Sequence, residues 1–255
     1  MKKYFVVTDV HGYYYEMLKA LQDAGFDKKN PDHILVSCGD LMDRGLYTLK
    51  CLKFVNRLPK KRKILIRGNH EDLIEECLNR KKFLYHDYHN GTVSTVFDLS
   101  STCTTENIDV YDAAKENPEY IKYMKSLVDY AEIGNFIFVH GWIPCDVVNN
   151  KNQDIKYKFN ENWKDGDWEA ARWINGMEAW HQDIVVPNKT IVCGHWYCSF
   201  GNSRYHGDGA EFPNLRSTNV EHRRANFNPF IDIGIIALDQ CVVQSHKVNC
   251  FVFEN

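Results

Sequence analysis

The sequence lacks any apolar run that approaches the roughly 18 residues a membrane-spanning helix requires. Its first residues, MKKYFVVTDVHG, are too short and turn polar too soon to form a signal peptide. No excess of basic charge is present either. With 31 basic and 34 acidic residues the net charge is −3, which gives no reason to expect stable binding to nucleic acid or to a membrane. These absences predict a cytoplasmic protein.

Cysteine pairs with the spacing of disulfide or zinc motifs are also missing. The nine cysteines are odd in number, and no two of them form a C-x-x-C pair. Most of them stand inside apolar runs, as Cys38, Cys193 and Cys241 do. We therefore expect buried, reduced thiols and no disulfide framework.

No internal repeat and no linker divides the 255 residues. The chain is 44% hydrophobic and 25% charged, which is ordinary for a globular protein and sufficient for a sizeable core. We expect a single domain over residues 1–255, with residues 81–133 as a candidate cap insertion within it.

The first 80 residues repeat a strand, a short loop and a helix three times. Such βαβ units predict an α/β fold with a largely parallel sheet. The expected strands are 3–8, 33–38 and 62–67, and the expected helices are 13–25, 46–58 and 71–80. Farther along, we expect helices at 117–133 and near the start of 166–180, strands at 135–141 and 189–196, a long polar loop at 197–228, and closing antiparallel strands at 229–255.

Side chains that bind metals stand where five of the predicted strands end. Because the carboxyl ends of neighbouring strands converge on one crevice of an α/β sheet, residues far apart in sequence can meet there. A lone histidine at a strand end is usually structural, but agreement among five strand ends favours a metal site. The set is Asp9, His11, Asp40, Asn69, His140 and His195.

Six ligands exceed what one open tetrahedral site needs, and they suit two divalent cations about 3.5–4 Å apart. Mixed oxygen and nitrogen ligands favour borderline metals, with manganese first and iron, zinc or nickel as alternatives, over calcium. Asp40 is the predicted bridging ligand. The assignment places Asp9, His11 and Asp40 on the first cation, and Asp40, Asn69, His140 and His195 on the second.

Taken together, the motifs DVHG, GDLMDRG, RGNHE, VHG and GH resemble those of the calcineurin-like metallophosphoesterases. The GDxxDRG and RGNHE forms are similar to the phosphoprotein phosphatase branch, which includes bacterial and phage serine/threonine phosphatases and symmetrical diadenosine tetraphosphate hydrolases. Segment 230–239 resembles the closing segment of that branch. Thr8, where the branch has glycine, is a departure that changes no ligand. The resemblance implies two mixed β-sheets in an αββα sandwich, a small helical or loop cap and a dinuclear metal centre.

The resemblance also implies roles for residues near the metals. Asp43 would orient His70, and His70 would donate a proton to the leaving group as the general acid. Arg44 would hold phosphate oxygens with its planar fork of donors. Arg67 and Arg172 are candidates for a second phosphate-binding arginine, with ion pairing or packing as their alternative roles.

These assignments predict an enzyme that hydrolyses phosphate monoesters, as serine/threonine protein phosphatases do, through in-line attack of a metal-bridging hydroxide. Its partner would be a phosphorylated protein or a small phosphoester or nucleotide. The first alternative is a dinucleoside polyphosphate hydrolase. In that case the tryptophans would provide a stacking platform for a base, where otherwise they form cap core: Trp163, Trp168, Trp173 and Trp180. The second alternative is a non-catalytic metal-binding scaffold of the same fold.

Overall fold

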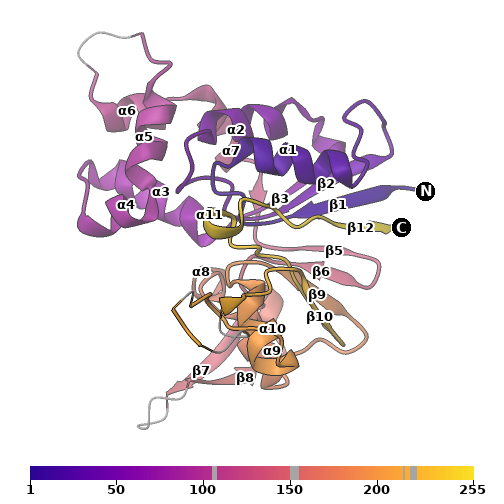
Figure 1. The fold of residues 1–255 in the computed structure, drawn as a ribbon. Coiled ribbons are helices and arrows are strands. Elements are labelled where there is room, and N and C mark those ends of the chain that lie inside the picture. Colours follow the sequence, from indigo (N-terminus) through magenta and orange to yellow (C-terminus); the bar gives the residue numbers. More distant parts are fainter. Residues whose placement is uncertain (105–107, 150–154, 215, 219–222) are drawn as a thin grey trace.

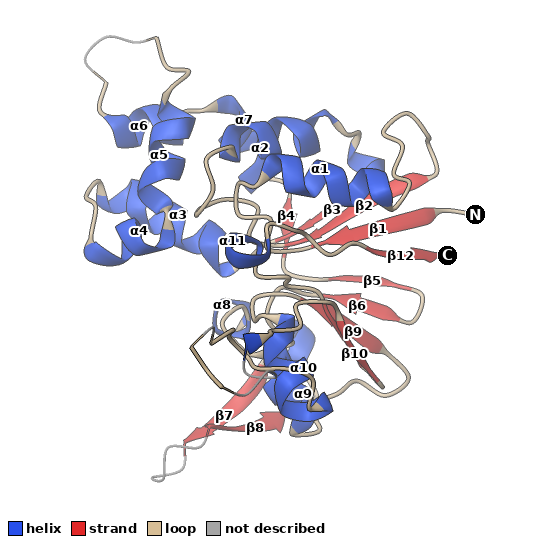
Figure 2. Ribbon diagram, in the orientation of Figure 1, coloured by secondary structure: helices blue, strands red, loops and turns tan. Residues whose placement is uncertain are grey.

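The computed structural model describes residues 1–104, 108–149, 155–214, 216–218 and 223–255. Two five-stranded β-sheets lie face to face, and helices cover the outer side of each sheet (Figures 1 and 2). The strand orders are β12-β1-β2-β3-β4 and β10-β11-β9-β6-β5. This αββα sandwich confirms the predicted fold class.

The first sheet is built mainly from the amino-terminal part of the chain. Strands β1 to β4 pair in parallel, and β12 joins β1 antiparallel. The strands are β1 (Lys3–Val7), β2 (His33–Cys38), β3 (Lys63–Ile66), β4 (Leu127–Val128) and β12 (Phe251–Glu254). The helices that follow the first three strands are α1 (Tyr14–Asp23), α2 (Thr48–Arg57) and α3 (Asn69–Arg80), with a short 3-10 turn η1 (Lys60–Arg62) before β3. The elements predicted for residues 1–80 are confirmed to within two residues at their ends.

The second sheet has a parallel centre and antiparallel edges. Strands β6, β9 and β11 run parallel, and β5 and β10 flank them antiparallel. The strands are β5 (Ala131–Ile133), β6 (Phe136–Phe138), β9 (Thr190–Cys193), β10 (Phe230–Asp232) and β11 (Ile235–Ala237). A separate antiparallel pair is formed by β7 (Cys145–Asn149) and β8 (Ile155–Phe159). The remaining elements on this side are η2 (Trp163–Asp165), α8 (Trp168–Ala171), α9 (Gly176–His181) and α10 (Cys198–His206).

Side chains of the central strands point alternately to the two faces of the sheet, which explains how the layers pack. In β1, Phe5 and Val7 join the core beneath the first helical layer, whereas Tyr4 and Val6 join the core between the two sheets. Successive side chains of a strand point to opposite faces, so a strand covered on both sides must be apolar throughout. Polar ligands can therefore stand only beyond the ends of such strands.

Residues 81–133 contribute both helices and strands. The helices are α4 (Tyr85–Asn90), α5 (Thr92–Ser100), α6 (Val110–Lys115) and α7 (Pro118–Met124). Val96, Ala114 and Tyr123 from this segment share the apolar cluster of α1, α2 and α3, and β4 and β5 enter different sheets. The description of 81–133 as a cap insertion stays a prediction.

Two predicted elements are wrong in part. The helix expected at 117–133 begins correctly, because Asn117 caps the amides of Glu119 and Tyr120, but it ends at Met124, where pairing with β3 draws the chain into β4. The loop expected at 197–228 begins with α10, whose first residues are buried beside β10, and residues 215 and 219–222 of it lie outside the described residues. Packing overrides local composition in both cases. The closing segment contains the antiparallel pair β10–β11 as expected, with a short helix α11 (Val242–Ser245) before β12.

All nine cysteines are free, and most are buried, as the spacing predicted. No helix among the described ranges has both the length and the apolar character needed to cross a bilayer.

Candidate metal centre

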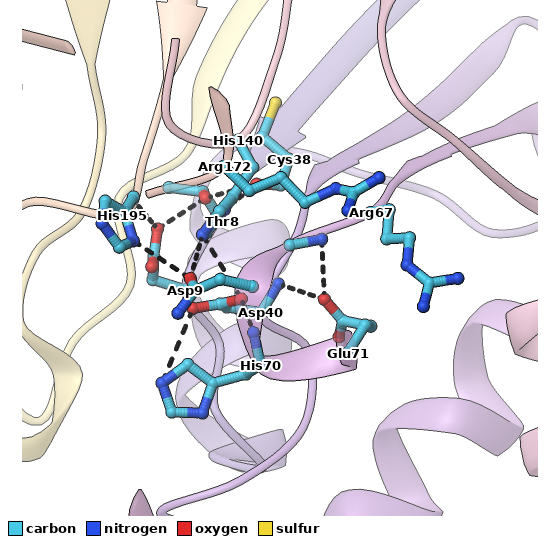
Figure 3. A network of polar contacts seen from close by, with 12 residues as sticks. Thr8, Asp9, Cys38, Asp40, Arg67, His70, Glu71, His140, Arg172 and His195 are labelled. Atoms are coloured by element: carbon cyan, nitrogen blue, oxygen red, sulfur yellow. Dashed lines mark hydrogen bonds and ion pairs between the residues drawn. The ribbon is translucent and has the colours of Figure 1, made fainter. Parts of the chain in front are cut away.

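The segments that follow β1, β2, β3, β6 and β9 bring all six predicted metal-ligating side chains together. Figure 3 shows four of them, Asp9, Asp40, His140 and His195. His140 Nε2 lies 2.8 Å from Asn69 Oδ1 and 3.3 Å from Asp40 Oδ1. His195 Nδ1 lies 3.0 Å from the same Asn69 oxygen. On the other side of the cluster, His11 Nε2 is 3.7 Å from Asp40 Oδ2 and 3.8 Å from Oδ1 of Asp9.

These atoms form two potential metal-binding groups that share Asp40. Within each group the ligand atoms lie no more than 4.8 Å apart. One group is Asp40, His140 and His195, and the other is His11, Asp40 and His70. Carboxylate and imidazole ligands arranged around a shared carboxylate fit a pair of borderline divalent cations. The second group contains His70 where the sequence assignment has Asp9, and that assignment stays a prediction.

Each predicted ligand histidine is oriented by a backbone carbonyl group. One ring nitrogen bonds to the carbonyl oxygen, which leaves the other directed at the cluster; such contacts set the tautomer and ring angle of metal-binding histidines. The pairs are His11 Nδ1 with Met42 O (3.1 Å), His140 Nδ1 with Cys38 O (2.8 Å), and His195 with the backbone of Trp173.

Glu71, which the sequence analysis missed, holds the loops on both sides of Asp40. Its carboxylate accepts the backbone N–H groups of Asp40 at 2.9 Å, Leu41 at 3.0 Å and Gly68 at 2.9 Å, and the Tyr123 hydroxyl at 3.0 Å. The signal in the sequence was its place in the RGNHE motif. Gly68 is required here, because a Cβ atom at this position would lie 2.1 Å from Asp40 Oδ1.

Backbone strain is concentrated at the same place. Left-handed φ values are uncommon for residues other than glycine, and each costs on the order of 1–3 kcal/mol. They persist where surrounding contacts hold the chain in place and often mark functional sites. The site residues with such values are Asp9 (φ 50°), His11 (50°), Asp40 (53°), Asp43 (72°), Arg44 (60°) and His195 (67°).

His70 and Asp43 are in contact, as the resemblance implied. His70 Nδ1 lies 2.8 Å from Asp43 Oδ2, which also accepts the Thr92 hydroxyl at 2.8 Å. Burial opposes the charged imidazole, but the carboxylates of Asp40 and Asp43 outweigh it and raise the pKa of His70 above its ordinary value. The other ring nitrogen lies 3.4 Å from Arg44 Nη2. Thr92 belongs to α5. Its bond to Asp43 joins segments that are distant in the chain, and the sequence offered no signal for it.

The two histidines of the second sheet have opposite electrostatic surroundings. Burial and the neighbouring His140 together lower the pKa of His195 to about 3, so the imidazole is neutral, as metal binding requires. Burial also disfavours charge on His140, but Asp40 and Asp9 outweigh burial and raise its pKa to about 10. The negative potential that retains a proton on His140 equally favours a cation at the cluster.

Arg44 faces the cluster, whereas the other two predicted phosphate-binding arginines are paired elsewhere. Asp72 lies between them: Arg67 Nε is 2.6 Å from its Oδ1 and Arg172 Nη1 is 2.7 Å from its Oδ2. Arg172 Nη2 also lies 2.6 Å from Oδ1 of Asp129. Both guanidinium groups lie on the side of the cluster away from His195 (Figure 3) and line a different cavity of about 400 Å³. Their role as phosphate ligands stays a prediction.

A cavity of about 290 Å³ opens onto the cluster. Its inner wall includes His11, Asp40, Asn69, His70, His195 and Arg44, and its outer wall carries the aromatic side chains of Trp173, Trp196, Tyr197 and Phe212. Tyr197 and Phe212 belong to the segment 197–228, which the sequence analysis described as a long polar loop. Trp196 and Phe212 were missed as site residues, because nothing local in the sequence distinguishes a cavity-lining aromatic side chain from a core one.

Comparisons with known proteins agree with this geometry. The calcineurin-like phosphoesterase family model matches residues 2–222. The asymmetrical bis(5'-nucleosyl)-tetraphosphatase PrpE of Bacillus velezensis is 27% identical over 246 residues, which cover 86% of this chain and 92% of that protein. A serine/threonine-protein phosphatase 2B catalytic subunit of Saccharomyces cerevisiae is 25% identical over 204 residues, which cover 74% of this chain and 29% of that protein. A cold-active protein-tyrosine phosphatase of a Shewanella species has the same fold, with a TM-score of 0.53, 15% identity and coverage of 100% of this chain and 76% of that one.

Proposed function

Because this chain belongs to the calcineurin-like phosphoesterases, a family of metal-dependent hydrolases with a dinuclear metal centre, we propose that it hydrolyses dinucleoside polyphosphates. The observation that carries the proposal is the cavity itself, which joins the ligand cluster, His70 and Arg44 to a wall of exposed aromatic rings. Such a wall suits a substrate with a phosphate chain and a planar base. The similarity to PrpE along nearly the whole of that protein supports the same substrate class. These two observations reverse the order of preference that the motifs alone suggested.

Bound divalent cations would be held by Asp9, His11, Asp40, Asn69, His140 and His195, and would supply Lewis-acid stabilisation of the phosphoryl oxygens and an activated water. The remaining steps belong to side chains of this chain. Arg44 directs its guanidinium at the cavity and holds a phosphate oxygen. Its pKa is raised although burial opposes the charge, because Tyr197 and Asp40 outweigh burial, so Arg44 stays a cation.

His70 acts as the general acid at the leaving group. Its Nδ1 bonds to Asp43, and its Nε2 lies at the cavity, 3.4 Å from Nη2 of Arg44. The raised pKa of His70 favours the protonated imidazole, which can donate to the departing phosphate oxygen. Thr92 fixes the other half of this pair through its bond to Asp43.

A second candidate function is the hydrolysis of phosphoserine or phosphothreonine in proteins. It is favoured by the similarity to the yeast phosphatase subunit across 74% of this chain. The ligand cluster and the Asp43–His70 pair serve both reactions equally well, so the two functions differ only in what the outer wall of the cavity binds.

The discriminating experiment is a comparison of kcat/KM for diadenosine tetraphosphate and for a phosphoserine peptide, with the purified protein and added Mn²⁺. We expect the dinucleotide to be preferred by at least about tenfold, which corresponds to about 1.4 kcal/mol. The Asp40→Asn variant is the control for contaminating phosphatases. A preference for the peptide would favour the second function, and inactivity on both substrates across Mn²⁺, Fe²⁺, Zn²⁺ and Ni²⁺ would contradict both.

A further inference from the structure

Two tryptophans are unusually exposed beside the catalytic cavity. All six tryptophans lie among the described residues, and the two most exposed are Trp173 (51%) and Trp196 (38%). Both line the cavity that opens onto the ligand cluster. An indole that stays exposed to water does not contribute its hydrophobic free energy to folding. Two such rings at one cavity therefore indicate a role in binding rather than in stability.

The other four tryptophans have structural roles. Trp163 is buried and packs edge-on against Tyr130 at a centroid distance of 5.2 Å. The remaining three donate their indole N–H to backbone carbonyls: Trp142 to Ile184 (2.9 Å), Trp168 to Lys164 (3.0 Å) and Trp180 to Ile233 (2.9 Å). Within the described part of the chain, the indole N–H groups of Trp173 and Trp196 have no such acceptor, so both rings present an unused donor as well as an aromatic face.

Both indole rings lie close to the imidazole of His195. The backbone of Trp173 bonds to the His195 imidazole, and Trp196 follows His195 directly in the chain. Each indole centroid lies 5.9 Å from the centroid of that imidazole. Trp196 is steadied from behind by Phe200, whose ring lies edge-on at 6.2 Å. The two indole rings therefore lie next to the cluster at which a phosphate would react.

We propose that Trp173 and Trp196 form the nucleobase-binding platform of the enzyme and set its preference for nucleotide substrates. The inference rests on the proposed function. A polyphosphate held by Arg44 and the ligand cluster places its ribose and base toward the outer wall, where these rings stand. Stacking needs only an aromatic face, so the platform accepts purine and pyrimidine bases alike. Its contribution lies in binding, because the base is remote from the bond that breaks.

The test compares substrates with and without a base, using Trp173→Ala and Trp196→Ala in the full chain with Mn²⁺. The substrates are diadenosine tetraphosphate and inorganic tripolyphosphate, which has the same phosphoanhydride bonds and no base. We expect each substitution to lower kcat/KM for the dinucleotide by between about fivefold and a hundredfold, mainly through KM, and to change tripolyphosphate turnover less than about twofold. Trp173→Phe and Trp196→Phe keep an aromatic face and should retain most of the dinucleotide activity.

Trp168→Ala is the matched control, because it removes an indole that is stacked on Tyr130 outside the cavity. It should leave the ratio of the two activities unchanged. An equal loss on both substrates in the cavity variants, or unchanged kinetics with the dinucleotide, would overturn the platform while leaving the proposed function intact. If the unmodified protein hydrolyses only a phosphoserine peptide, the proposed function itself fails and the platform with it.

Discussion

The two sheets contribute differently to the site. Loops of the first sheet carry both carboxylates of the predicted ligand set, the Asp43–His70 pair and Arg44, and five of the six strained backbone positions lie there. The second-sheet side supplies His140 and His195 and, next to the latter, the exposed aromatic wall. We infer that the proposed general acid and phosphate-binding arginine belong to one side of the crevice, and that the proposed contacts to the base belong to the other. Substitutions on the two sides should therefore have different kinetic signatures.

The largest effect is expected from Asp40→Asn, because both potential metal groups share this carboxylate. Loss of one charge and of the bridging geometry should reduce bound metal from two ions to at most one per chain and lower kcat by more than the ~10²–10⁴-fold contribution of a general acid. Elemental analysis and steady-state kinetics check this. Full metal content with near-normal turnover would contradict a bridging role for Asp40.

His70→Ala should lower kcat by roughly 10²–10⁴-fold on substrates with a poor leaving group, because the departing oxygen no longer receives a proton. The loss should be much smaller on p-nitrophenyl phosphate, whose leaving group needs little protonation. Metal content should be retained. An equal loss on both kinds of substrate would point to a structural or metal-binding role for His70.

Glu71→Gln is expected to cost about 10–100-fold in metal affinity or activity, the usual range for residues that position metal ligands. The amide would present N–H donors toward backbone N–H groups that now bond to the carboxylate. Metal titration measures the effect. Glu76→Gln, an exposed glutamate on the same helix, is the control and should bind metal as the unmodified protein does.

The pH dependence of kcat should distinguish a substitution at the proposed general acid from one in the aromatic wall of the cavity. Burial opposes the charged imidazole of His70, but Asp40 and Asp43 outweigh it and raise the pKa, so the acid form is present below the raised value and is lost as pH rises through it. Asp43→Asn should move the alkaline limb of kcat to lower pH. Trp173→Ala should leave that limb unmoved. If the alkaline limb of Asp43→Asn lies at the same pH as that of the unmodified protein, the Asp43–His70 pair does not act as the general acid.

The smallest effect is expected for Arg67→Ala. Its guanidinium is paired with Asp72 and Glu75 near the surface, and ion pairs of this kind contribute about 0–1 kcal/mol. We expect less than about a fivefold change in kcat/KM, against a much larger loss for Arg44→Ala, which faces the cavity. Comparable losses for the two variants would restore Arg67 to the phosphate-binding set that the motifs suggested.

The contrast between the sides also explains what could be predicted from the sequence. Asp9, Asp40 and Asn69 follow strands whose apolar runs are obvious, and the parallel βαβ pattern alone implies that their ends converge. Glu71 and Thr92 could not be assigned, because their roles depend on which backbone groups fold against them.

The part of the chain beyond residue 80 was harder to predict. The end of the helix at Met124 and the start of α10 at Cys198 depend on pairing with β3 and on packing beside β10, which local composition does not report. Trp173 and Trp163 look alike in sequence, yet one is half exposed at the cavity and the other is buried. Recognition surfaces are therefore less visible in a sequence than the ligands of a metal centre.

The central claim is that Asp40 joins two cations at the crevice between the sheets. It is tested most directly by a crystal structure of the protein with Mn²⁺, using anomalous scattering to locate the metal. We predict two anomalous peaks about 3.5–4 Å apart, each within bonding distance of an Asp40 oxygen. A single peak, or a pair of peaks of which Asp40 contacts only one, would contradict the account.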